Sequence, residues 1–231
     1  MVASGSVCGR YSLSMTPEEV VKALACEGPP PGHPPRWNVA PTQPVIVAVV
    51  TNERVRRLRE MRWGLVPSWA KDPAIGNRMI NARAETLAVK PSFRDAYRRR
   101  RCLIVADGFY EWRKEGDRKQ PVWIHPVDGG LLTFAGLWDT WRSPDGVVVD
   151  FCTIVTCAAN DLIGAFHERM PVILPPEARD LWLDPEPRRP EELADLLVPC
   201  PSGLLAIRPV STLVNSPARE GRDLIDERGR S

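Results

Sequence analysis

The chain has 231 residues, 43% of them hydrophobic and 26% charged, with a formal net charge of +2, a balance typical of a globular protein with its own core. It has no apolar run of the roughly 20 residues that cross a bilayer, and no secretory signal, so we expect a cytoplasmic protein without membrane contact. Six cysteines without a C-x-x-C pair and three scattered histidines argue against a zinc site, and we expect reduced thiols, no metal and no cofactor.

The charge is distributed unevenly along the chain. Between Glu53 and Arg101 there are fourteen Lys and Arg residues against five Asp and Glu residues. A basic middle in a nearly neutral protein favours one face that binds a polyanion such as nucleic acid. The alternative is a solvated surface with arginines at helix ends.

The first predicted element is a helix over residues 16–28. Thr16 suits the N-cap, Pro17 suits the first turn, and Gly28 would end the helix. The prolines of residues 28–44 remove hydrogen-bond donors, so we expect no regular structure there.

Strands outnumber helices in the rest of the chain. Helices are predicted at residues 90–100, 160–170 with Asn160 as N-cap, 175–184 and 189–198. Strands are predicted at residues 45–50, 54–64, 101–114, 120–127, 131–141, 149–159 and 203–210, with hairpin turns at 128–130 and 144–146. Because the strands follow one another, we expect a single α+β domain with a curled, mostly antiparallel, barrel-like sheet and peripheral helices.

Cys8 is the first candidate for chemistry. Residues 1–7 show no helical or strand periodicity and stop just before it. A cysteine at a true N-terminus carries a free amine, with a pKa of about 8, beside its thiol, and the two groups together can convert an aldehyde into a thiazolidine. An internal cysteine cannot, because its nitrogen is an amide. The alternative is a buried structural thiol.

Three further segments hold candidate polar groups. Asn81, Arg83 and Glu85 would share one face of an extended segment and suit a sugar phosphate, unless they form a polar loop. Glu111 lies among aromatic residues, which raise a carboxyl pKa, unless it is a surface residue. His167 is the best of the three histidines for proton transfer, although a lone histidine is more often structural.

The segment RWGLVPSWAKDP (62–73) carries two tryptophans that look exposed, next to cationic residues. Such rings suit base stacking in single-stranded nucleic acid. Packing in the core is the alternative for each ring.

Seven segments, taken together in this order, resemble the SOS response-associated peptidase family, whose members are also called abasic-site-processing proteins. They are CGRYSL, NVAPTQ, RWGLVPSWAKD, NARAET, DGFYEW, TFAGLWDTW and HERMPVIL, and the resemblance runs from about Cys8 to about Pro217. It implies a DNA-repair sensor, acting as a monomer, that captures abasic sites in single-stranded DNA and is nucleoid-associated when bound. It also implies a curled β-sheet core with a positive DNA channel.

The resemblance also implies roles for individual residues. Cys8 forms the thiazolidine with the ring-opened deoxyribose, Asn81 steadies the sugar adduct, Glu111 is the acid–base group, and His167 assists ring opening and crosslink reversal. The residues that it assigns to DNA binding are Arg10, Pro41, Trp69, Arg83 and Thr156.

The chain departs from the family pattern before Cys8, where it has seven residues and the family has one. Left in place, residues 1–7 would acylate the Cys8 nitrogen and prevent thiazolidine formation. Three explanations stay open: a start codon assigned too far upstream, with Val7 as the initiator; a remnant of cloning; or autopeptidase removal, with Glu111 activating Cys8. We favour the first, and expect a domain over residues 8–217 and a polar, disordered tail over residues 218–231.

Two other functions remain open at this point. A cysteine peptidase acting on other proteins would use Cys8 as nucleophile and His167 as base. A non-catalytic single-stranded DNA-binding module would use the tryptophan segment and the basic middle of the chain.

Overall fold

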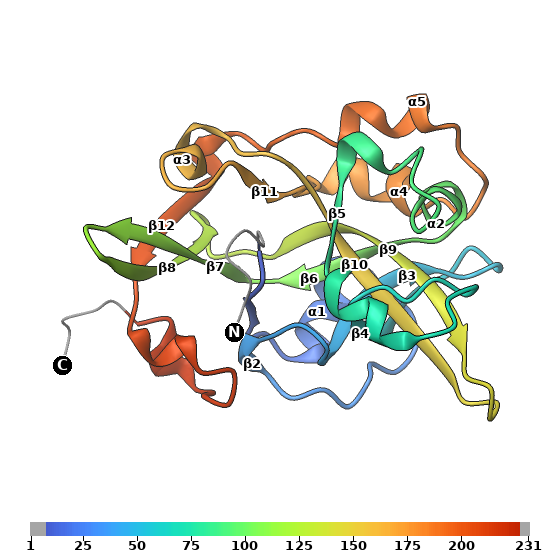
Figure 1. Cartoon of the computed structure of the whole chain (residues 1–231), viewed down its shortest axis with the longest axis horizontal. Coiled ribbons are helices and arrows are strands. Elements are labelled where there is room, and N and C mark those ends of the chain that lie inside the picture. Colours follow the sequence, from blue (N-terminus) through green and yellow to red (C-terminus); the bar gives the residue numbers. More distant parts are fainter. Residues whose placement is uncertain (1–7, 227–231) are drawn as a thin grey trace.

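Two β-sheets share one core in the computed structural model, which describes residues 8–226, and short helices lie around them (Figure 1). The first sheet is antiparallel throughout and has five strands in the order β12–β8–β7–β1–β2. The strands are β1 (Tyr11–Leu13), β2 (Arg36–Val39), β7 (Gly108–Glu115), β8 (Arg118–Pro126) and β12 (Leu205–Pro209).

The second sheet closes into a barrel. Its ring consists of β3 (Pro44–Val50), β4 (Arg56–Trp63), β6 (Arg101–Ala106), β9 (Leu132–Arg142) and β10 (Val148–Ala158). The ring closes because β10 pairs antiparallel with β9 and parallel with β4. The C-terminal end of β10 also holds β5 (Asn81–Arg83) and β11 (Arg169–Pro171). The predicted curled, mostly antiparallel sheet of an α+β fold is confirmed.

Aromatic side chains join the two sheets inside the core. Phe134 of β9 packs edge-on against both Tyr11 of β1 and Phe109 of β7, with ring centroids 6.2 and 5.9 Å apart. Trp63 of β4 lies against Tyr11 at 5.4 Å. Both β1 and β7, which flank the site described below, are therefore fixed to the barrel by buried rings.

The helices are short and lie at the edges of the sheets. They are α1 (Pro17–Leu24), α2 (Arg94–Arg99), α3 (Asp161–Gly164), α4 (Arg179–Leu183) and α5 (Pro190–Leu193). Thr16 and Asn160 cap α1 and α3 as predicted. Helix α1 ends before the predicted Gly28, because Ala25 takes the left-handed conformation and its N–H bonds to carbonyls of the last turn. In residues 8–226 we find no helix with the length and apolarity to cross a bilayer.

Two expectations about irregular segments are wrong. The proline-rich stretch contains β2, which begins directly after its last consecutive proline and pairs with β1. The supposed disordered tail is docked up to residue 226: Glu220 accepts hydrogen bonds from Arg36 Nε and from the Trp37 N–H, and Leu224 is buried. The expectations about the leader (residues 1–7) and about the end of the tail (residues 227–231) concern segments that lie outside the described residues.

Candidate active site

The centre of the candidate site is a hydrogen bond between Cys8 and Glu111. The backbone N–H of Cys8 donates to Glu111 Oε1 over 2.8 Å, and both residues are buried. The pairing of β1 with β7 produces this contact, since Tyr11 lies opposite Phe109 and the Tyr110 N–H donates to Arg10 O. The nitrogen that would be the nucleophile thus already lies against a carboxyl group.

Burial determines the protonation of both groups. Desolvation raises the pKa of Glu111 to about 7, and the hydrogen bonds from the N–H groups of Cys8 and Trp112 only partly oppose it. Near neutral pH this carboxyl can therefore both accept and donate a proton. Desolvation, and secondly the charge of Glu111, raise the pKa of the Cys8 thiol well above its ordinary value, so the thiol stays protonated.

A second cluster, formed around Arg169 of β11, contains three of the residues of interest. The guanidinium makes a bidentate pair with Glu85, at 2.6 and 3.0 Å, and Nη2 also donates to Thr156 O and Thr156 Oγ1. The backbone N–H of Arg169 donates to His167 Nδ1 over 3.1 Å. Burial lowers the pKa of His167, which keeps its ring neutral near pH 7.

Asn81 and Arg83 lie on β5, next to this cluster. The register places Asn81 beside Ile154 and Arg83 beside Thr156 of β10, with Asn81 half-buried and Arg83 exposed. Glu85 was expected on the same face, but β5 ends at Arg83 and a 3-10 turn over Ala84–Thr86 follows. The turn directs the Glu85 carboxylate to Arg169.

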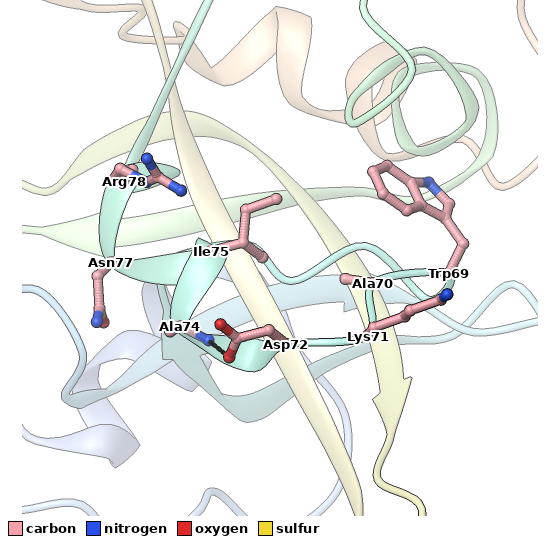
Figure 2. Close-up of a pocket in the computed structure, with 8 residues that line it drawn as sticks. All are labelled: Trp69, Ala70, Lys71, Asp72, Ala74, Ile75, Asn77 and Arg78. Atoms are coloured by element: carbon pink, nitrogen blue, oxygen red, sulfur yellow. Dashed lines mark hydrogen bonds between the residues drawn. The ribbon is translucent and has the colours of Figure 1, made fainter.

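A shallow groove, which we call the Trp69–Arg83 groove, runs along the surface from the tryptophan segment to β5. It consists of two hollows, of about 490 and 320 Å³, that share Ile75 and Arg78. Figure 2 shows the first hollow, with Trp69 at one end, Arg78 at the other and Ile75 between them. The charged residues that line the two hollows are Lys71, Asp72, Arg78, Arg83 and Lys90. With four basic residues and one acidic residue, the groove suits a polyanion.

The two tryptophans of residues 62–73 have different environments. Trp69 is 58% exposed, as predicted. Trp63 is buried, contrary to prediction, because it is the inward-facing last residue of β4 and its indole Nε1–H donates to Ile80 O over 2.8 Å. Only one of the two rings is therefore accessible for stacking.

Arg10, which was expected to contact DNA, is only 3% exposed. Its Nη1 donates to Asn38 Oδ1 and to Val214 O, which connects β1, β2 and the docked C-terminal segment. Pro41 is partly exposed in the turn after β2. In this state the structure brings neither residue into the lining of the Trp69–Arg83 groove, and their assigned roles stay predictions.

Sequence reasoning missed three residues that hold the site together. Arg169 lies two residues after His167, but its contacts with Glu85 and Thr156 come from segments that are distant in the sequence. Asp139 and Trp141 on β9 hold the backbone on both sides of Trp69. Nothing local in the TFAGLWDTW segment indicates this contact. Within residues 8–226, no group of three or more His, Cys, Asp or Glu residues is arranged to hold a metal ion.

Comparison with known proteins identifies relatives over nearly the whole chain. A family model described as SOS response associated peptidase (SRAP) matches residues 7–217. Abasic site processing protein YoqW of Bacillus subtilis is 40% identical over 95% of this chain and 99% of its own, and abasic site processing protein YedK of Escherichia coli is 33% identical over the same shares. A solved protein from Bacteroides thetaiotaomicron superposes with a TM-score of 0.86 at 25% identity, covering 95% of this chain and 99% of its own.

Proposed function

Because this chain belongs to the SOS response associated peptidase family, we propose that it processes abasic sites in single-stranded DNA by capturing them covalently through an N-terminal Cys8. The observation that carries the proposal is the hydrogen bond from the Cys8 nitrogen to Glu111, a buried carboxyl whose pKa is raised to about 7. The family relatives named above are called abasic site processing proteins, which supports the same substrate.

The proposed capture has two steps and loses one water molecule. The free Cys8 amine attacks the aldehyde carbon of the ring-opened deoxyribose, and the resulting carbinolamine loses its hydroxyl as water to give an imine. The thiol then adds across the C=N bond, so that a C–S bond forms and the thiol proton moves to nitrogen. Glu111 takes a proton from the attacking amine and returns one to the departing hydroxyl.

The other groups position the sugar and the strand. Asn81 and Arg83, adjacent on β5, would hold the deoxyribose and a phosphate, and Thr156 lies beside Arg83 on β10. His167 would assist opening of the sugar ring. Lys71, Arg78 and Lys90 add positive charge along the Trp69–Arg83 groove for the flanking strand.

The chemistry requires that Cys8 is the first residue. If the chain removes residues 1–7 itself, Cys8 is the natural nucleophile: its thiol attacks the carbonyl carbon before it, the peptide nitrogen leaves as the amine of Cys8, and water hydrolyses the thioester. Glu111, in contact with the Cys8 nitrogen, would supply the proton to that nitrogen.

A peptidase that acts on other proteins is less compatible with the site. Such an enzyme would use His167 as the base for the Cys8 thiol, whereas in residues 8–226 no hydrogen bond joins the two: the Cys8 N–H donates to Glu111, and His167 accepts from the Arg169 N–H. The exposed Trp69 and the basic groove do favour binding of intact single-stranded DNA as a second candidate function. The two functions can be told apart, because a covalent adduct survives denaturation of the protein and a non-covalent complex does not.

Intact-mass spectrometry tests the proposal directly. A protein that begins at Cys8, incubated with a single-stranded oligonucleotide carrying one abasic site, should gain the mass of one oligonucleotide less one water. An oligonucleotide without the abasic site should give no gain. The Cys8→Ala variant should give none after heating, because its imine cannot close to a ring and hydrolyses. If Cys8 is shown to be the first residue and no adduct forms, the proposal is wrong.

A further inference from the structure

The loop that carries Trp69 is held on both sides by residues of β9. On one side, the Ser68 N–H donates to Asp139 Oδ2 over 2.9 Å. On the other side, the Trp141 indole Nε1–H donates to Ala70 O over 2.7 Å. Asp139 and Trp141 are two positions apart on one strand, so their side chains lie on the same face of β9. We call this arrangement the β9 clamp.

Both members of the clamp are themselves fixed. Asp139 is 7% exposed, and its other oxygen accepts the Thr140 N–H and lies 3.3 Å from Arg100 Nε. Trp141 is also buried, and its ring packs against Val66 and Phe151. Because their other contacts leave these side chains little freedom, they can set the position of the loop.

The loop is also closed on itself. The Ala70 N–H donates to Pro67 O over 2.9 Å, which forms a turn around Trp69. At the base, Gly64 has a φ of +127° that favours glycine, and a Cβ on Gly76 would lie 2.6 Å from Gly64 O. The two ends of the segment from residue 64 to residue 76 thus touch through bare backbone.

The β9 clamp holds the loop that exposes the apolar ring of Trp69 to solvent. Among the large apolar side chains that are exposed in residues 8–226, Trp69 is the aromatic one, and it borders the basic groove. Exposure of such a ring is poor for stability but useful for binding, because a backbone held at both neighbouring residues has little conformational freedom left to lose when a ligand stacks on the ring.

We propose that Asp139 and Trp141 are positioning residues, which hold Trp69 as a fixed stacking surface for an unpaired base of the bound DNA strand. The inference rests on the proposed function for the identity of the ligand. A nucleobase is the ligand class that fits, because the ring offers a π-face, and Lys71 and Arg78, which line the same hollow, suit the phosphates of the strand. Neither β9 residue needs to touch DNA.

A double-mutant cycle tests whether the clamp acts through the ring. The probe is a fluorescent single-stranded oligonucleotide with a tetrahydrofuran abasic analogue, which binds but has no aldehyde, and the readout is Kd by anisotropy. Trp69→Ala should weaken binding about tenfold, as expected for loss of one stacked base. Asp139→Ala and Trp141→Phe should each weaken it about threefold when Trp69 is present, and not at all when Trp69 is already Ala.

Asp150→Ala is the matched control. Asp150 lies on the neighbouring β10, accepts a hydrogen bond from Thr140 Oγ1 and pairs with Arg59, but no hydrogen bond joins it to the Trp69 loop. This variant should bind like the parent protein. Trp141→Phe keeps a buried aromatic ring, although a smaller one, and removes the N–H donor, so it tests the clamp even if Asp139→Ala fails to fold.

The inference is overturned if Asp139→Ala and Trp141→Phe weaken binding equally with and without the Trp69 ring, or leave the parent affinity unchanged. Failure of the proposed function would look different. In that case the parent protein would form no adduct with an aldehyde-bearing abasic strand, whereas the coupling between β9 and Trp69 would still be measurable with the analogue.

Discussion

The Cys8–Glu111 pair and the Trp69–Arg83 groove differ in almost every physical respect. The pair is buried, and desolvation raises the pKa of both side chains, which favours their neutral, protonated forms. The groove is open, its cationic side chains are exposed, and its aromatic ring extends into solvent. Under the proposed function, proton transfer would take place where water is excluded, and the DNA strand would bind where the cationic side chains are exposed. Changes in the pair should alter rates, and changes in the groove should alter affinities.

Removal of the nucleophile should have the largest effect. We expect Cys8→Ala to abolish the heat-stable adduct with abasic single-stranded DNA completely, because the five-membered ring cannot close without the thiol. Binding of the tetrahydrofuran analogue should stay within about twofold, since the buried thiol does not line the groove. Denaturing gels and anisotropy measure the two quantities. A large loss of analogue binding would show that the two regions are not separate.

Replacement of the acid–base group comes next. Glu111→Gln keeps a hydrogen-bond acceptor for the Cys8 nitrogen but cannot take up its proton, so adduct formation should slow by about a hundredfold or more. The parent rate should rise with pH through about 7, as the carboxyl ionises and becomes a base, and the variant should lack this step. Quenched-flow or gel time courses between pH 5 and 9 measure the rate. An equal pH profile in both proteins would contradict the role of Glu111.

The raised pKa of Glu111 also makes a prediction about stability. The folded state holds this proton more tightly than the unfolded state, so the free energy of unfolding should fall as pH rises from about 4.5 to about 7. At about 1.4 kcal/mol per pKa unit, the loss approaches about 3 kcal/mol. Between pH 5 and pH 8, urea unfolding should show most of this fall in the free energy of unfolding of the parent protein, and Glu111→Gln should lack it. If the two proteins respond alike to pH, the pair is not desolvated as described.

The smallest effect should come from the groove. Arg83→Ala should weaken binding of single-stranded DNA about tenfold, the value of one charge-assisted hydrogen bond. The slope of log affinity against log salt should fall by about 0.7, as for one phosphate contact. Arg113→Ala is the matched control, because Arg113 is a part-exposed arginine that pairs with Glu115 at the far end of β7. An unchanged salt slope in Arg83→Ala would remove Arg83 from the strand-binding surface.

The sequence predicted features that depend on neighbouring residues, but not contacts between distant ones. Local patterns identified the strands of the barrel and the caps of α1 and α3, because a cap or an apolar alternation acts within a few residues. Cys8 and Glu111 were each singled out by their chemistry. Their contact could not be predicted, since 103 residues separate them and only the pairing of β1 with β7 brings them together.

The wrong prediction for Trp63 and the unforeseen burial of Arg10 have the same origin. Trp63 looked exposed beside Trp69, but its position at the end of β4 turns it inward. The burial of Arg10, whose contact with DNA stays a prediction, was not foreseen either, because β2 and the C-terminal segment enclose it. In both cases a distant strand determines whether a side chain reaches solvent, and local sequence does not contain that information.

Strand β10 pairs with four other strands, and this has a consequence for the order in which the protein folds. This strand closes the barrel against β4 and β9, and its remaining length then holds β5 and β11. Pairings between segments so distant along the chain are slow to form, because the intervening loops must be closed first. During synthesis Cys8 emerges early, whereas β10 is completed only after about two thirds of the chain. We therefore expect the Trp69–Arg83 groove to form late, so that under the proposed function a nascent chain carries Cys8 long before it can bind DNA.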